Sequence, residues 1–346
     1  MLRTLTRLPP GLLDTDSRGL AERLGGPTLI ELPGAREPAV FVALLLHGNE
    51  TVGWEAIREL LRERLARFGE LRLPRALAIF IGNVAAAAAG LRHLPGQPDY
   101  NRVWPGSDQP HSPEQTLMSE VVARMRTRGL FASLDLHNNT GTNPHYACLN
   151  RLDQDSLQLA RLFGRTVVHF LRPLGVQSLA MSALCPAVTL ECGKTGDRQG
   201  VEHAKSFVDA VLHLEEFPRH PVPPRELDLL HTVARIGIPE AVRFGFAGEA
   251  LDLLLAPGLE QMNFCELPAG TLFARVNGGS ARLAVQDEAG RDVTARYFQL
   301  AAGELRLSRP AMPAMLTADT TVIRQDCLGY LMERIALPSD QAERAT

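Results

Sequence analysis

The sequence His47-Gly48-Asn49-Glu50 follows an unbroken apolar run and constrains the fold more than any other stretch of the chain. The run, residues 39–46 (AVFVALLL), is short and apolar throughout, which is typical of a strand buried on both faces. His47 and Glu50 stand three residues apart at its end, so an imidazole nitrogen and a carboxylate oxygen can turn toward one point. We therefore predict a buried strand that delivers two ligands of a catalytic zinc site.

A third metal ligand is expected from a distant histidine that also ends a strand. Residues 130–136 (LFASLDL) form a largely apolar stretch, and His137 follows it directly. Two histidines and one glutamate leave a fourth coordination position open for water or a carbonyl oxygen. Each motif alone also suits an ordinary turn or strand end. The order of these motifs along the chain favours the metal site.

The composition excludes several classes of function. The hydrophobic content is 45%, the charged content 22% and the net charge −3, which is ordinary for a soluble globular protein and predicts neither a nucleic-acid nor a membrane partner. No segment approaches the ~20 apolar residues of a membrane span, and the N-terminal residues do not form a signal peptide. We therefore expect a cytoplasmic protein. Whether it forms a homo-oligomer stays open.

The five cysteines do not point to a disulfide framework or a structural zinc site, because their number is odd and no CxxC pair occurs. Cys192 directly follows Glu191, and on a strand neighbouring side chains point to opposite faces. We therefore assign Cys192 to the core rather than to a nucleophile.

The first ~215 residues alternate strand and helix signals. Ser112, with Pro113 and Gln115 after it, has the pattern of a helix start, and Gly129 that of a helix end. This alternation predicts an α/β fold with a mainly parallel or mixed central sheet and helices on both faces. Ligands of such sheets bind beyond the carboxyl ends of the strands. The strands are expected at 28–32, 39–46, 75–81, 130–136 and 187–191, and the helices at 50–68, 112–129, 153–163 and 201–217.

The chain changes character at residues 218–224 (PRHPVPP), where four of seven residues are proline, as in a linker. We predict a catalytic domain at 1–217, this linker, and a smaller β-rich domain at 225–346. Short strand-like pieces separated by glycines occur in the last part, at 271–276, 281–286 and 297–300.

Four motifs occur in a specific order along the chain. They are HGNE (47–50), DxNRxxPG (99–106), DLHN (135–138) and LExG (190–193). In this order the sequence resembles the succinylglutamate desuccinylase/aspartoacylase family of the zinc carboxypeptidase clan, over about residues 38–200. The resemblance implies a zinc carboxypeptidase-like fold, and a β-rich second domain fits it loosely.

The resemblance also implies a role for each matching residue. The implied ligands of one Zn²⁺ per chain are His47, Glu50 and His137. Asn101, Arg102 and Asn138 are the implied substrate-binding residues, Arg92 the residue that stabilises the oxyanion, and Glu191 the catalytic glutamate.

Elementary chemistry gives similar roles. Zinc lowers the pKa of bound water toward ~7, and Glu191 can accept the proton of that water and pass it to a leaving amine. Arg92 can share the negative charge of the tetrahedral intermediate with the metal. The planar fork of Arg102 fits a carboxylate through two parallel hydrogen bonds, to which Asn101 can add another.

Two departures from the family make the substrate less certain than the zinc site. The resemblance leads us to expect an arginine about ten residues before Glu191, but residues 177–187 contain none, and Arg172 is the nearest. It also leads us to expect a tyrosine at 318–323, which contains none, although Tyr297 and Tyr330 lie on either side.

We therefore predict zinc-dependent hydrolysis of an amide bond in a small, carboxylate-bearing N-acyl amino acid or similar compound. A metallocarboxypeptidase acting on short or modified peptides is the first alternative. A non-catalytic metal- or metabolite-binding protein on the same scaffold is the second.

Overall fold

The computed structural model describes residues 2–248, 251–277 and 282–337, which form two compact units. Of these residues, unit 1 contains 2–138, 145–228 and 336–337, and unit 2 contains 139–144 with the described part of 229–335. The domain boundaries expected from the sequence stay a prediction. No helix in the described part of the chain combines the length and apolar composition that a membrane crossing requires.

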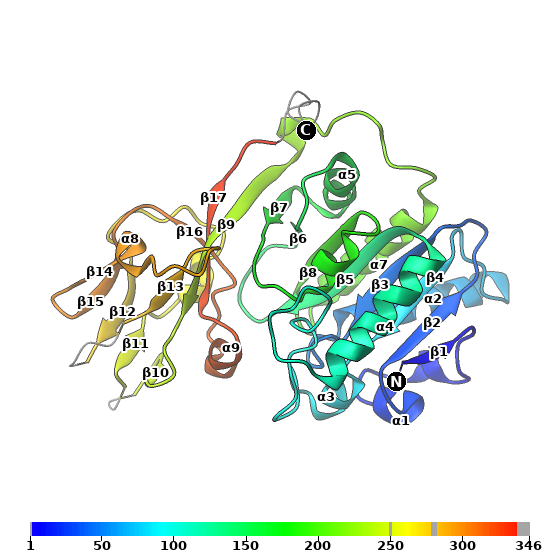
Figure 1. The fold of residues 1–346 in the computed structure, drawn as a ribbon, viewed down its shortest axis with the longest axis horizontal. Helices are drawn as coiled ribbons and strands as arrows, with labels where there is room; N and C mark the ends of the chain where they lie inside the picture. The colour runs from blue at the N-terminus through cyan, green and yellow to red at the C-terminus, as the bar shows by residue number, and fades with distance from the viewer. Residues whose placement is uncertain (1, 249–250, 278–281, 338–346) are drawn as a thin grey trace. The chain divides into compact units, whose positions relative to one another are not determined.

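Unit 1 is built on a mixed sheet with the strand order β1-β2-β4-β3-β5-β8-β6-β7 (Figure 1). Strand β3 is parallel to both β4 and β5, whereas β2 runs antiparallel to β4 and β6 antiparallel to β8. The predicted α/β class with a mixed sheet is therefore confirmed. The strands are β1 (Arg3–Leu5), β2 (Thr28–Leu32), β3 (Ala39–Leu44), β4 (Leu77–Ile81), β5 (Leu130–Asn139), β6 (Tyr146–Leu149), β7 (Thr166–His169) and β8 (Ala187–Lys194).

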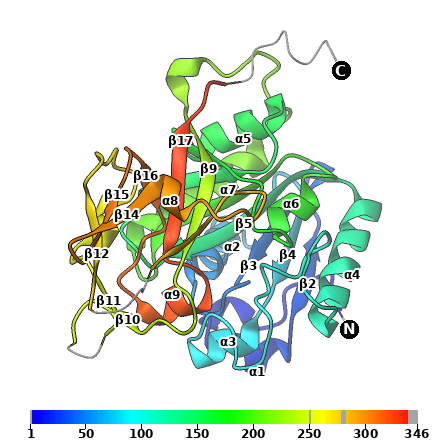
Figure 2. The same ribbon diagram turned by 60° about the vertical axis from the view of Figure 1, so that its left-hand side comes forward.

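Helices cover both faces of this sheet, as predicted. Helix α4 lies over one face of the sheet (Figures 1 and 2). Its apolar side chains belong to the same core cluster as Phe41 and Ala43 of β3. The first turn of α2 lies on the opposite face, where a Cβ at Gly53 would come within 2.9 Å of Leu44 Cβ. The helices of unit 1 are α1 (Leu20–Leu24), α2 (Val52–Phe68), α3 (Val84–Ala89), α4 (Pro113–Arg128), α5 (Gln154–Phe163), α6 (Gln177–Met181) and α7 (Arg198–His213), with short 3₁₀ turns η1 (Leu12–Asp14) and η2 (Pro224–Glu226).

Local capping explains where the predicted helix α4 begins and ends. The Ser112 hydroxyl accepts a hydrogen bond from the Gln115 amide at 3.2 Å, and Gly129 ends the helix with a positive φ. The predicted span of α7 was wrong by several residues at each end. The Asp197 carboxylate caps the helix earlier than expected, and Leu214 leaves the helical conformation.

Two of the strands that carry candidate residues are longer than predicted. Strand β5 continues to Asn139 and β8 to Lys194, so His137 and Glu191 lie within strands rather than at their ends. Strand β3 is shorter than predicted, because Leu45 adopts a left-handed conformation with φ 55° and ends the strand at Leu44. His47 therefore lies in the loop beyond β3.

Unit 2 is rich in β-structure, which confirms the predicted smaller β-rich part. Strand β9 pairs antiparallel with β13 and β17, and β17 pairs antiparallel with β16. A second sheet has five strands in the order β10-β11-β12-β15-β14. Residue 281 of the predicted strand 281–286 lies outside the described residues. The elements are β9 (Asp228–Gly237), β10 (Phe244–Gly245), β11 (Leu253–Leu255), β12 (Leu272–Val276), β13 (Ala284–Gln286), β14 (Phe298–Ala301), β15 (Glu304–Leu307), β16 (Met312–Ala314), β17 (Gly329–Arg334), α8 (Thr294–Tyr297), α9 (Thr320–Gln325) and η3 (Leu259–Met262).

The close packing of α7 on β8 gives a test of this fold. A Cβ at Gly200 would lie 2.0 Å from the Cys192 carbonyl oxygen, so Gly200→Ala must push the helix away from the strand that carries Glu191. We expect this overpacking to lower the free energy of unfolding by about 1–3 kcal/mol, measured by denaturant titration. Gly26→Ala is the matched control, because no atom lies within 4 Å of its added Cβ, and its change should stay within about 1 kcal/mol. Equal stability of the two variants would contradict the packing described here.

Candidate metal centre and active site

The loop after β3 places His47 and Glu50 through a tight turn, in which the Glu50 amide donates to the His47 carbonyl at 3.1 Å. Gly48 lies against α3, and a Cβ at this position would come within 2.2 Å of the Ala87 nitrogen. The Gly48 amide also donates to the Arg92 carbonyl at 3.0 Å. A glycine is therefore needed here for close approach to the backbone of α3 and not only for turn geometry.

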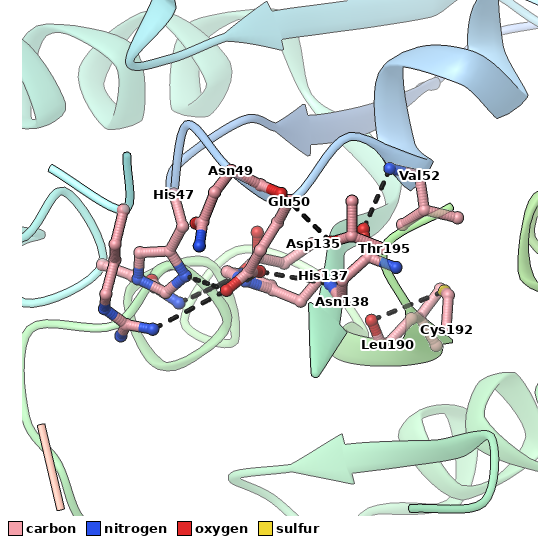
Figure 3. Close-up of polar contacts among 12 residues, drawn as sticks. His47, Asn49, Glu50, Val52, Asp135, His137, Asn138, Leu190, Cys192 and Thr195 are labelled. Atoms are coloured by element: carbon pink, nitrogen blue, oxygen red, sulfur yellow. Dashed lines mark hydrogen bonds and ion pairs between the residues drawn. The ribbon is translucent and has the colours of Figure 1, made fainter. Parts of the chain in front are cut away.

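Strand register brings the second histidine to the same point. Leu44 of β3 pairs with Leu136 of β5, and the rings of His47 and His137 lie 5.0 Å apart between centroids. The Glu50 carboxylate lies between them, with Oε1 2.9 Å from His47 Nδ1 and Oε2 2.7 Å from His137 Nδ1 (Figure 3). All three side chains are buried, and one ligand atom from each lies within 4.8 Å of the others.

A carboxylate lies behind each of the two imidazole rings. His47 Nε2 is 2.9 Å from Asp99 Oδ1, and His137 Nε2 is 2.9 Å from Asp135 Oδ2. A ring that donates from Nε2 to a carboxylate keeps the lone pair of Nδ1 for a cation. Because both Nδ1 atoms point toward Glu50, the donor set fits a divalent metal, and nitrogen and carboxylate donors of this kind suit zinc.

The charges of the group are strongly coupled. Burial alone would lower the pKa of His137, but the carboxylates of Asp135 and Glu50 raise that pKa well above its usual value. Burial alone would raise the pKa of Glu50, yet the nearby imidazoles of His47 and His137 bring it below its ordinary range. Asp99 likewise keeps a pKa well below its usual value despite burial, owing to His47, Arg92 and Arg102. The pocket therefore favours ionised carboxylates around a positively charged centre.

The structure brings Arg92 to this group, and its predicted role at the oxyanion stays a prediction. Its Nε and Nη2 donate to Asp99 Oδ2 at 3.1 and 2.9 Å, and its Nη1 lies 3.6 Å from Glu50 Oε1. The guanidinium is therefore fixed beside the candidate metal ligands.

The predicted Asn101-Arg102 pair lies in a loop that is held from several sides. The Asn101 amide nitrogen Nδ2 donates to Asp135 Oδ2 at 3.3 Å, and Oδ1 accepts from the Gln177 backbone at 2.9 Å. The Arg102 guanidinium donates to the Asn101 carbonyl at 2.9 Å. Gly175 packs so closely on this loop that an added Cβ would be 2.2 Å from the Arg102 carbonyl oxygen.

Asn138 connects three elements. Its backbone amide donates to Glu50 Oε2 at 3.1 Å, and its side-chain Oδ1 accepts from the Val52 amide at 3.0 Å (Figure 3). Its Nδ2 donates to the Gly193 carbonyl at 2.9 Å. These bonds fix the start of α2 and the end of β8 relative to β5. The predicted contact of Asn138 with substrate stays a prediction.

Glu191 is buried on β8, opposite Tyr146 of β6 and two residues before Gly193. Cys192, the next residue, is fully buried in the core, as predicted. Burial raises the pKa of the Cys192 thiol well above its usual value, and the carboxylates of Glu191 and Glu50 add to this rise. Cys192 therefore stays a neutral thiol, which argues against a role as nucleophile.

Sequence reasoning missed the roles of Asp99 and Asp135 as partners of the imidazoles. Asp135 could have been found, because residues two apart on a strand share a face and His137 follows at that distance. No local signal relates Asp99 to His47, which lies 52 residues away.

Three residues stand near the two departures from the family: Arg172 in unit 1, and Tyr297 and Tyr330 in unit 2. Arg172 has a side chain that is 49% exposed and pairs with Asp108 at 3.2 Å. Within unit 2, Tyr297 is buried in the core, and Tyr330 pairs with Ala314 along β17.

The fold and the site define an α/β protein whose buried His-Glu-His group could hold a metal ion, and comparison with known proteins narrows this class to one family. Residues 37–217, more than half of the chain, match the succinylglutamate desuccinylase/aspartoacylase catalytic domain. The chain belongs to this family, which confirms the resemblance seen in the four sequence motifs.

Individual relatives agree with this assignment. The succinylglutamate desuccinylase of Yersinia enterocolitica serotype O:8 / biotype 1B is 25% identical over 299 residues, which cover 78% of this chain and 84% of that protein. The solved structure of the succinylglutamate desuccinylase from Chromobacterium violaceum has a TM-score of 0.57 at 20% identity, covering 87% of this chain and 86% of its own. Murine aminoacylase 3 has a TM-score of 0.51 at 18% identity, with coverages of 88% and 99%. The structural likenesses show a shared fold.

Removal of one imidazole tests the candidate metal centre. We expect His137→Gln to weaken zinc binding by more than about 100-fold, beyond the 10–100-fold typical of losing an outer-shell partner. Zinc affinity is measured by competition with a chromophoric chelator on protein that elutes as folded from gel filtration. His213→Gln is the control, because this side chain is 54% exposed on α7. Unchanged affinity in folded His137→Gln protein would exclude His137 from the metal group.

Proposed function

We propose that this chain is a zinc-dependent hydrolase that cleaves the amide bond of a small, carboxylate-bearing N-acyl amino acid or similar compound. One observation carries the proposal: His47, Glu50 and His137 offer buried ligand atoms within 4.8 Å of one another inside the catalytic domain of a deacylase family. Relatives named as succinylglutamate desuccinylase and aminoacylase support an N-acyl amino acid as the substrate class.

Zinc held by His47, Glu50 and His137 would supply Lewis acidity, which lowers the pKa of a water molecule toward ~7 and polarises the scissile carbonyl. Glu191 then acts as the general base that accepts a proton from the attacking water. It returns this proton to the amide nitrogen as the carbon–nitrogen bond breaks, so that a carboxylate and an amine leave. Its burial on β8 keeps this carboxylate away from bulk solvent.

Arg92 is the group best placed to stabilise the oxyanion. Its guanidinium is fixed by Asp99 beside Glu50, so it needs no reorganisation when negative charge develops on the carbonyl oxygen. Loss of one preorganised donor of this kind costs about 3–4 kcal/mol in other enzymes.

Arg102 and Asn101 are proposed to hold the substrate carboxylate. The guanidinium presents paired donors in a plane, which fit the two oxygens of a carboxylate. The Asn101 amide nitrogen donates to Asp135 and lies 3.2 Å from His137 Nε2. It is proposed to add a hydrogen bond to a substrate oxygen beside the guanidinium. Asn138 supports this arrangement by holding the start of α2 and Gly193 in place.

Exchange of the proposed base tests the chemical step. Glu191→Gln keeps the size of the side chain but removes its capacity to accept a proton from water, so kcat should fall by about 10²–10⁴-fold while zinc content is unchanged. Glu202→Gln, on the exposed surface of α7, is the control and should keep full turnover. Full turnover of Glu191→Gln would remove Glu191 from the mechanism, and loss of zinc would assign it to the metal site instead.

A substrate panel tests the proposed carboxylate grip. Wild-type protein should hydrolyse acetyl, formyl or succinyl amino acids faster than the same compounds with the α-carboxylate converted to carboxamide. Arg102→Lys should lower kcat/KM for the carboxylates by ~10–100-fold, the equivalent of about 1.5–3 kcal/mol for a charged hydrogen-bonded pair, and leave the carboxamides unaffected.

The same panel separates the alternatives. Cleavage confined to dipeptides would favour a metallocarboxypeptidase. Absence of turnover in folded, zinc-loaded protein would favour a non-catalytic metal- or metabolite-binding protein.

A further inference from the structure

Asp135 is a buried carboxylate that the proposed mechanism does not use. It lies on β5 two residues before His137, so both side chains project from the same face of the strand. Its Oδ2 is 2.9 Å from His137 Nε2 and also accepts from Asn101 Nδ2 at 3.3 Å. One oxygen atom therefore contacts both a candidate metal ligand and a residue of the substrate motif.

The other oxygen of Asp135, Oδ1, lowers the stability of the fold because it is buried without a hydrogen bond from any described residue. The side chain is 0% exposed, and within the described residues no group donates a hydrogen bond to Oδ1 and no arginine or lysine pairs with the carboxylate. Asp99, behind the other imidazole, differs in this respect because Arg92 neutralises it. An incompletely satisfied buried carboxylate destabilises a fold, so a purely structural role for Asp135 is a poor explanation of its position.

We infer that Asp135 is a positioning residue that sets the metal ligand His137 and the substrate-binding Asn101 through one oxygen atom. Accepting the Nε2 proton fixes the His137 tautomer in which Nδ1 is a free donor, and the negative charge makes that nitrogen a stronger ligand. Accepting from Asn101 fixes the amide that faces the substrate carboxylate. Zinc affinity and substrate affinity therefore depend on the same side chain. This inference rests on the proposed metal site.

Asp135→Asn tests the inference on the intact chain. The substituted amide presents His137 Nε2 with either a neutral oxygen or an NH₂ group, and the NH₂ group forces the proton onto Nδ1, which then cannot bind a cation. Zinc affinity, measured by chelator competition on metal-free protein, should fall by ~10–100-fold, and KM should rise in reloaded protein.

Ser133→Ala is the matched control for zinc affinity. Ser133 lies two residues earlier on the same face of β5, is equally buried and bonds to Gln177, but contacts neither histidine. It should keep the wild-type zinc affinity. Wild-type affinity in Asp135→Asn, or an equal loss in both variants, would overturn the inference while leaving the proposed hydrolase intact. Failure of the wild-type chain to bind zinc would remove the metal site itself.

A second measurement does not depend on the folding of a variant. In zinc-loaded wild-type protein with ¹⁵N-labelled histidine, long-range proton–nitrogen correlation spectra report which ring nitrogen carries the proton. We expect His137 to be protonated at Nε2 and to bind metal through Nδ1. Protonation at Nδ1 would overturn the assignment of Asp135.

Discussion

The carboxylate of Glu50 bridges His47, in the loop after β3, and His137 on the neighbouring parallel strand β5, and the site depends on this bridge. Its oxygens lie 2.9 and 2.7 Å from the Nδ1 atoms of His47 and His137. A buried carboxylate is tolerated only where donors or opposite charges surround it. The pairing of Leu44 with Leu136 places His137 beside this carboxylate. A slip of one residue in the register would turn His137 to the other face of the sheet.

The second layer of charge links the metal ligands to the residues proposed to hold substrate. Asp99 contacts His47, Arg92 and the Asn101 backbone, whereas Asp135 contacts His137 and the Asn101 side chain. Each imidazole therefore lies between two carboxylates. A divalent cation bound in this buried site would lower the energy of all the carboxylates at once.

Sequence patterns over a few neighbouring residues predicted those helix and strand ends that capping residues and short apolar runs determine. Strand β2 has the predicted bounds of 28–32, and Ser112 and Gly129 bound α4 as their capping chemistry requires. The four-residue strands β6 and β7 escaped prediction because pairing with neighbours, rather than their own sequence, stabilises them. Residues 139–144 group with unit 2 through contacts such as the Asn263 side chain with the Thr142 carbonyl, 121 residues away, which no periodicity encodes.

The same distinction applies to the site. HGNE and DLHN contain the candidate metal ligands as residue types, so the sequence sufficed to propose them. The hydrogen bonds of the Asn101 side chain with Asp135 and with the Gln177 backbone depend on the fold and could not be predicted from the motifs. The segment 177–187, which lacks the arginine expected from the family, begins with α6 (Gln177–Met181). This helix holds the loop that contains Asn101 and Arg102, because the Gln177 backbone amide donates to Asn101 Oδ1. The Gln177 side chain donates to the Ser133 hydroxyl. Arg172 pairs with Asp108 near the surface. Under the proposed function, recognition of a substrate carboxylate would depend on how rigidly the loop around Arg102 is held, because α6 contributes hydrogen bonds to that loop where a cation was expected.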